Sequence, residues 1–317
     1  MLNRRILRVK AFKVLYAYAQ NPDLSLKEAL SSLEASSQAT RDLYLYLLAL
    51  IPALTQEACR RTEAARGKFN PTEEDLHPNL RFVENAVSAL FTQDPDFQRL
   101  LEKKHFSWEQ NDAFVHKLYE TLKTRPYFTA YMEAPESGLR QDAHLWAQVF
   151  TQELEDDQDL QAILEDLSVY WADDLGYALG ACIRTLEELP RTGRWELPPL
   201  YQSDQLKAQG KEADDDAAFV RRLLSAAYGR FQEYSALVAA SVSKWDRDRL
   251  YTTDVVLIAM GLAEVETFPE IPVKVSINEY VEISKFYSTP KSRGFVNGLL
   301  DRLIRDRMDK GLINKSL

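Results

Sequence analysis

The sequence predicts an all-α protein, because its composition disfavours sheet and its apolar residues recur at helical spacing. The 317 residues include only 11 glycines, and Leu, Ala, Glu and Gln are abundant while runs of β-branched residues are few. The 14 Phe and 15 Tyr, within 45% hydrophobic residues overall, supply enough apolar surface for a packed core. A chain of this length corresponds to about two domains.

The amino-terminal segment predicts two helices. Residues 2–20 contain neither Pro nor Gly, so we expect one uninterrupted helix there. Ser25 and Glu28 have the spacing of a capping box, in which each side chain accepts a hydrogen bond from the other residue's backbone N–H. This box predicts a second helix over residues 25–34.

The middle of the chain predicts a series of helices. Residues 41–66 are strongly apolar, and we expect a helix that Pro52 kinks and Gly67 ends. Further helical patterns follow near residues 79–91, 108–123, 140–155, 158–171 and 174–189.

Residues 190–213 are the best candidate for a linker between domains. They have few periodic apolar positions and contain Pro190, Gly193, Pro198, Pro199 and Gly210. The acidic triplet Asp214-Asp215-Asp216 follows, and we interpret it as the start of a helix, where negative charge is favourable. It has no further ligands at a spacing that would bind a metal ion.

The carboxy-terminal segment predicts three helices separated by proline turns. An apolar helix is expected over 253–264 and is ended by the prolines near residue 270. Ser276 and Glu279 form a second candidate capping box, which predicts that the next helix starts there. Pro290 is expected at the first position of the last helix, which extends to about residue 308.

The net charge of −9 is unevenly distributed. Residues 1–20 contain five basic side chains and no acidic one, while residues 247–317 contain 11 basic and 10 acidic side chains. The remaining residues, 21–246, therefore carry a net charge of −15. This balance argues against general coating of nucleic acid, but it leaves a local basic feature at the amino terminus.

No pattern of catalytic, metal-binding or cofactor-binding residues stands out, so we predict neither an enzyme nor a cofactor. Cys59 and Cys182 are far apart, and we expect both to be core residues of a cytoplasmic protein. Glycine-rich phosphate loops, zinc-protease motifs and nucleophile elbows are absent from the sequence, and the four histidines stand singly. We expect no secretory signal and no membrane span.

Two basic clusters are candidates for phosphate binding. On a helix, Arg4, Arg5 and Arg8 lie within about one turn of each other, and their guanidinium groups could converge on one phosphate-bearing strand. Lys291, Ser292 and Arg293 lie at the predicted start of the last helix, where free backbone amides also favour an anion. Taken alone, each cluster is equally compatible with a solvated helix end.

The carboxy-terminal residues resemble the signature of the NusB family of bacterial transcription antitermination factors. The resemblance is carried by an ordered set of residues: Ile271, Pro272, Lys274, Ile277, Asn278, Glu279, Glu282, Lys285, Phe295, Val296, Asn297, Gly298, Leu299, Leu300 and Asp301. Upstream, Trp245, Arg249 and Leu250 also match, and at the amino terminus the basic helix with Arg4, Arg5, Arg8, Ala11, Leu15 and Tyr16 is similar to the family's first helix.

The resemblance implies a fold and a function. The fold is a helical bundle in which the first helix packs beside the carboxy-terminal helices. The function is binding of boxA-type single-stranded RNA, together with ribosomal protein NusE, to promote read-through by RNA polymerase within its antitermination complex. The implied RNA contacts are Arg4, Arg5, Arg8, Lys291, Ser292, Arg293 and Phe295. The implied NusE surface lies near Tyr16 and Asp254, while Glu279 would cap its helix and Gly298 would admit a neighbouring helix.

This chain departs from the family in its length, because residues 39–213 have no counterpart. We expect residues 1–38 and 214–310 to form the NusB-like bundle, with residues 190–213 as a linker. Residues 39–189 would be an inserted acidic helical domain or a degenerate second copy of the bundle. A faint repeat with an offset of 74 residues, which places Trp171 on Trp245, favours the second alternative.

Two other functions remain open at this point. One is a helical adaptor of the transcription machinery that binds only proteins. The other is a component of a ribosomal RNA methyltransferase system, because NusB-like bundles also occur fused to such enzymes. Retention of Arg4, Arg5 and Arg8 favours RNA binding over the adaptor. Neither cysteine has the surroundings of a methyltransferase nucleophile.

Overall fold

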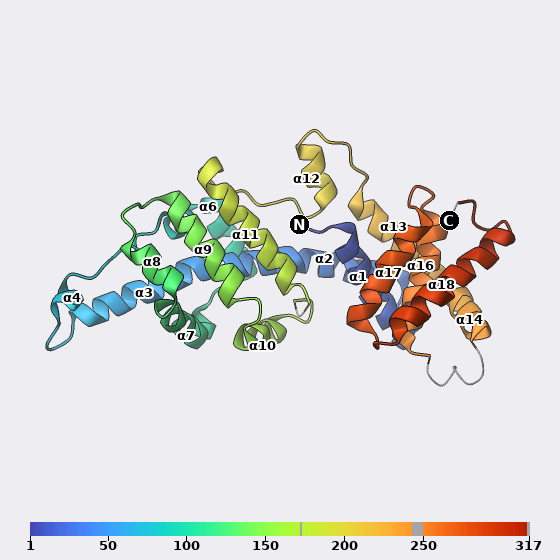
Figure 1. Ribbon diagram of the computed structural model, residues 1–317, viewed down its shortest axis with the longest axis horizontal. Helices are drawn as coiled ribbons and strands as arrows, with labels where there is room; N and C mark the ends of the chain where they lie inside the picture. The colour runs from blue at the N-terminus through green and yellow to red at the C-terminus, as the bar shows by residue number, and fades with distance from the viewer. Residues whose placement is uncertain (172, 243–249, 316–317) are drawn as a thin grey trace. The chain divides into compact units, whose positions relative to one another are not determined.

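The protein is helical, which confirms the predicted fold class. The computed structural model describes residues 1–171, 173–242 and 250–315, and these residues form helices and loops without a named strand (Figure 1). The chain divides into two compact units. Unit 1 comprises Gln38–Pro198 together with Met1, and unit 2 comprises Leu2–Ser37 and Pro199–Leu317.

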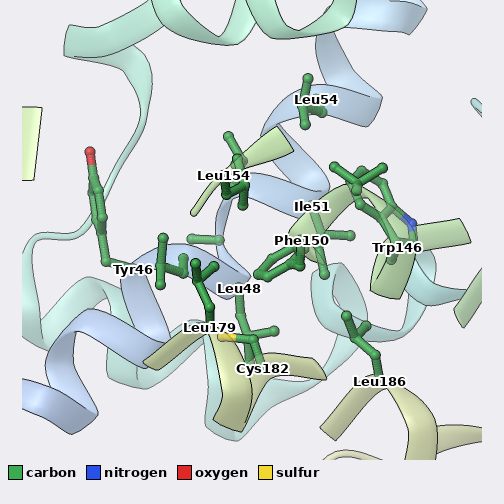
Figure 2. Close-up of a cluster of buried hydrophobic side chains, with 14 of the residues drawn as sticks. Tyr46, Leu48, Ile51, Leu54, Trp146, Phe150, Leu154, Leu179, Cys182 and Leu186 are labelled. Carbon is green, nitrogen blue, oxygen red and sulfur yellow. The ribbon is translucent and has the colours of Figure 1, made fainter. Parts of the chain in front are cut away.

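Unit 1 is built around α3 (Leu50–Arg66), α9 (Leu139–Glu153) and α11 (Leu175–Thr192). Its core contains Trp146 and Phe150 of α9, which Figure 2 shows beside Ile51 of α3 and Leu186 of α11. The second half of α2 (Leu26–Leu48) also belongs to this unit, which is completed by α4 (Glu73–Leu76), α5 (Ala86–Gln93), α6 (Pro95–Lys104), η1 (Glu109–Asn111), α7 (Asp112–Lys123), α8 (Pro126–Glu133) and α10 (Gln158–Leu167).

Unit 2 surrounds one apolar helix, α16 (Thr252–Thr267). Nearly every residue of α16 from Val256 to Val265 is buried, because helices pack on all its sides. These neighbours are α1 (Arg4–Gln20), α13 (Asp216–Gly229), α14 (Phe231–Ser241), α17 (Val273–Tyr287) and α18 (Ser292–Asp309), several of which Figure 1 shows next to α16. The short α12 (Gln202–Ala208) and the first part of α2 complete the unit.

Two of the predicted helix starts are confirmed in detail. The Ser25 backbone N–H donates to Glu28 Oε2 at 2.9 Å and the Glu28 N–H donates to Ser25 Oγ at 3.3 Å, which is the reciprocal pattern of a capping box. Asp215 caps α13 by accepting from the Ala218 N–H at 3.0 Å. The acidic triplet therefore starts a helix, as predicted.

The predicted end of the second helix near residue 34 is wrong, whereas the interruption expected near Pro52 is present three residues earlier, at Ala49. α2 is continuous from Leu26 to Leu48, and the chain turns at Ala49. Pro52 lies in the first turn of the separate helix α3, where its missing N–H leaves no hydrogen bond unmade. The polar residues after Glu34 do not end the helix, because Ser36, Ser37 and Thr40 are themselves buried.

The second predicted capping box is also wrong. α17 begins at Val273, so Ser276 lies inside the helix and is buried, and its hydroxyl donates to Glu264 Oε1 at 2.7 Å. Glu279 forms ion pairs with arginines of α1 instead of capping a helix. The close helix approach expected at Gly298 is not found there, because nothing lies within 4 Å of a Cβ added to that residue. It occurs instead at Gly261, where an added Cβ would lie 2.7 Å from Leu300 Cδ2.

Two short helices, α6 and α8, were missed because each starts at a proline, a residue that also signals a turn. α6 starts with Pro95 after the cap Asp94, and α8 starts with Pro126. Proline is favoured at the first helical position, so the same residue that ends one helix opens the next.

The predicted linker, residues 190–213, contains the point where the two units meet in sequence, between Pro198 and Pro199. It also contains the last turn of α11 and all of α12. Trp245, on which the faint repeat depends, lies outside the described residues, as does Arg249 of the family signature. The duplication stays a hypothesis.

Candidate functional site

Arg8 forms a buried ion pair with Glu264 that connects three helices of unit 2. Its Nε and Nη2 atoms donate to Glu264 Oε2 and Oε1 at 2.7 and 2.8 Å, and the two side chains are 4% and 0% exposed. The Glu264 carboxylate also accepts from Ser276 at 2.7 Å and from the Tyr280 hydroxyl at 2.9 Å. Burial alone would lower the pKa of Arg8, but the hydrogen bonds and charge of Glu264 raise it above its ordinary value.

Arg4 and Arg5 bind carboxylates in other directions. Arg4 pairs with Asp214 at 2.9 Å and Asp216 at 3.1 Å, at the start of α13. Arg5, whose side chain is 51% exposed, donates to both carboxylate oxygens of Glu279 at 3.0 and 2.7 Å. These hydrogen bonds lower the pKa of Glu279.

The basic amino-terminal helix is therefore less available to an external anion than its charge predicts. Arg8 is buried, and Lys10 is buried too, with its Nζ 2.8 Å from the Ser36 carbonyl oxygen. Each of the three guanidinium groups that we expected to converge on one phosphate binds a carboxylate of the same unit. Their RNA contacts remain a prediction.

The start of α18 carries cations that face solvent. Lys291 and Arg293 are exposed, whereas Ser292 between them is buried and Phe295 is half-buried. Lys291, Ser292 and Phe295, but not Arg293, line a cavity of about 660 Å³ together with residues at the start of α16. Its lining consists of Tyr251, Asp254, Thr289, Pro290, Lys291, Ser292 and Phe295.

A buried carboxylate lies at this cavity. Asp254, 3% exposed, accepts from Ser288 Oγ at 2.6 Å and from Ser292 Oγ at 2.9 Å. Burial raises its pKa, and the two hydroxyl hydrogen bonds oppose that shift. Through these hydrogen bonds Asp254 holds the turn between α17 and α18. Tyr16, the other predicted protein contact, lies on α1 and is half-buried beside Phe12.

Replacing Arg5 by alanine should have a small effect on stability that depends on pH. The pair with Glu279 is partly exposed, so we expect a loss of about 1 kcal/mol or less at pH 7. Because the folded pKa of Glu279 is lowered, this stabilisation is present above its unfolded pKa and disappears as the pH falls through the folded value. Urea unfolding of both proteins at pH 7 and pH 3 measures this, and an unchanged difference at pH 3 would contradict it.

Other site types receive no support among the described residues. The described residues contain no cluster of three potential metal ligands, and none of their helices is long and apolar enough to cross a membrane. Cys182 is buried as predicted, with its pKa raised by burial, but Cys59 is only half-buried.

Comparison with known proteins identifies relatives of unit 2. The model of the NusB family matches residues 196–305. The transcription antitermination protein NusB of Salinibacter ruber is 31% identical over 129 residues, which cover 37% of this chain and 81% of that protein. Its counterpart in Myxococcus xanthus is 36% identical over 129 residues, covering 36% of this chain and 92% of that protein.

A third relative is matched over a smaller part of its length. The transcription antitermination protein NusB of Chloroherpeton thalassium is 35% identical over 98 residues, which cover 31% of this chain and 46% of that protein. No solved structure is significantly similar to this chain.

Proposed function

Because this chain belongs to the NusB family, we propose that it is a non-enzymatic transcription antitermination protein that binds boxA-type single-stranded RNA of ribosomal RNA transcripts together with ribosomal protein NusE. In this role it promotes read-through by RNA polymerase in the cytoplasm. The observation that carries the proposal is that residues 196–305, which match the family, contain both the cavity and the exposed cations at the start of α18.

The proposed RNA contacts divide into two groups by their exposure. Lys291, Arg293 and Arg5 are exposed, and they can neutralise phosphates of a single strand, while the half-buried Phe295 offers a ring edge or face to a base. Arg8 and Ser292 are buried, and they act on RNA by positioning α1 and the start of α18. Arg4 would have to leave Asp214 and Asp216 to bind phosphate.

The proposed NusE contact is Tyr16, on α1. Asp254 is the other residue proposed for the NusE surface, and its carboxylate also accepts hydrogen bonds from Ser288 and Ser292 within unit 2. Tyr16→Ala tests the proposed NusE contact, and unchanged NusE binding by this variant would contradict it.

Unit 1 is proposed to contact proteins of the RNA polymerase antitermination complex. Residues 38–198 contain 28 acidic and 16 basic side chains, a net charge of −12, and residues 141–183 contain ten acidic side chains and no Lys or Arg. Such a surface repels RNA phosphates and attracts basic protein surfaces.

Replacing Lys291 and Arg293 together by alanine should weaken binding of boxA-type RNA and reduce its salt dependence. Each phosphate contact to a single strand contributes about 0.7 to the slope of log affinity against log salt, so we expect the slope to fall by about 1.4. A mobility-shift titration at several salt concentrations, with and without the host's NusE, measures both quantities.

The matched control removes two exposed cations that lie further along the chain, one within α18 and one directly after its last residue. Arg302 and Lys310 are exposed, and Arg302→Ala with Lys310→Ala should leave the salt slope unchanged. Equal slopes for all three proteins would refute the assignment of Lys291 and Arg293. Absence of RNA binding by the unmodified protein, with and without NusE, would favour the protein-only adaptor.

A further inference from the structure

The cavity at the start of α18 has features that contacts to phosphate do not require. Besides Lys291, its lining contains two aromatic rings and a carboxylate. Tyr251, directly before α16, is 51% exposed although it is a large aromatic residue. The volume of about 660 Å³ lies within the range of about 300–1,000 Å³ typical of sites for small ligands.

The carboxylate of Asp254 retains capacity to accept hydrogen bonds. Each of its oxygens has about two acceptor positions, and one donor hydroxyl is accounted for on each, from Ser288 at 2.6 Å and Ser292 at 2.9 Å. The described residues place no cation within ion-pair distance of it. This group repels a phosphate but favours an N–H donor that enters the cavity.

We propose that this cavity binds one unstacked nucleobase that carries an exocyclic amino group. The base lies against the rings of Tyr251 and Phe295, its amino group donates to Asp254, and Lys291 at the rim attracts the adjoining phosphate. The proposal rests on the proposed RNA binding and adds a base-specific subsite to it.

The combination of groups favours a nucleobase over the other candidate occupant, a side chain of a protein partner. Single-stranded RNA is recognised by stacking its bases on aromatic side chains and by hydrogen bonds to the base edges. A carboxylate is a partner for an amino group on a base edge. The cavity offers both, next to an exposed lysine that matches the charge of the RNA backbone.

The test uses boxA-type RNA oligonucleotides in which each nucleotide in turn is made abasic. The unmodified protein should bind the RNA about tenfold more weakly when one particular nucleotide is abasic. Stacking of a base on an aromatic side chain increases the affinity by about 5- to 150-fold. Tyr251→Ala should bind the intact RNA about tenfold more weakly and should no longer distinguish that abasic position. Phe69→Ala, which removes a 99% exposed ring from unit 1, is the control and should behave like the unmodified protein.

A second arm tests Asp254. An RNA in which the base at that position lacks its amino group should bind the unmodified protein at least about fivefold more weakly. Asp254→Asn should reduce that discrimination, and circular dichroism should show that it folds. If Asp254→Asn does not fold, the amino-deleted RNA with the unmodified protein still decides this arm.

The outcomes separate this proposal from the proposed function. No binding of any RNA by the unmodified protein contradicts the proposed function itself. Binding without a sensitive abasic position, or Tyr251→Ala with unchanged affinity and discrimination, overturns the base subsite and leaves RNA binding intact. Loss of NusE binding by Tyr251→Ala with unchanged RNA binding assigns the cavity to a protein side chain and also overturns the proposal.

Discussion

Replacing Glu264 by alanine should lower the free energy of unfolding of unit 2 by about 3–5 kcal/mol, because it leaves the buried Arg8 guanidinium without its counter-charge. Ser276 and Tyr280 would also lose their acceptor. Urea unfolding followed by circular dichroism measures the loss. Hydrogen exchange should increase in α1, α16 and α17, the three helices that the carboxylate connects. A loss below about 1 kcal/mol would contradict this role of the ion pair.

A double variant distinguishes the ion pair from the packing around it. Arg8→Met with Glu264→Leu removes both charges and keeps apolar volume, so it should be clearly more stable than Glu264→Ala, but it should remain less stable than the unmodified protein because Ser276 and Tyr280 still lose their acceptor. Arg5→Ala, which breaks the partly exposed pair with Glu279, is the matched control, with an effect of about 1 kcal/mol or less. If the double variant is as unstable as Glu264→Ala, loss of packing explains the effect.

Replacing Trp146 by alanine should destabilise unit 1 by about 3–5 kcal/mol. Its ring is fully buried in the core of unit 1, where its centroid lies 5.4 Å from that of the Phe82 ring, and Figure 2 shows Trp146 among other buried side chains, so truncation leaves a large cavity. It also removes the hydrogen bond from Nε1 to Asn85 Oδ1, which is 3.1 Å long and buried. Thermal and urea unfolding of the full chain measure the change.

The control for this prediction is another aromatic residue of unit 1. Phe69 is 99% exposed, so Phe69→Ala should change the free energy of unfolding by less than about 0.5 kcal/mol. Similar losses for both variants would mean that burial of Trp146 does not stabilise the unit. Trp146→Phe keeps most of the apolar volume but not the hydrogen bond. Its loss of free energy of unfolding should lie between those of Trp146→Ala and Phe69→Ala.

Local sequence patterns predicted the features that depend on neighbouring residues. The helical class, the Ser25–Glu28 capping box and the cap at Asp215 were all predictable, because helix spacing and capping involve residues three or four positions apart. The same rule failed at Ser276 and Glu279, whose spacing matches a capping box. Both residues instead bind groups on other helices.

The candidate site could be predicted only in part. The sequence indicated Lys291, Arg293 and Phe295, and the structure places Lys291 and Phe295 around one cavity. Tyr251 was missed, because a lone tyrosine before an apolar helix carries no signal in the sequence.

The sequence by itself determined that this protein is helical, that its ends resemble the NusB family and that five basic residues lie within its first 20. Only the tertiary structure decided which of those charges can meet a ligand. Arg8 and Glu264 are 256 positions apart, and no local pattern reveals that folding brings them to 2.7 Å. A buried charge needs a counter-charge, so folding neutralises part of the basic helix internally and leaves Lys291 and Arg293 exposed at the start of α18.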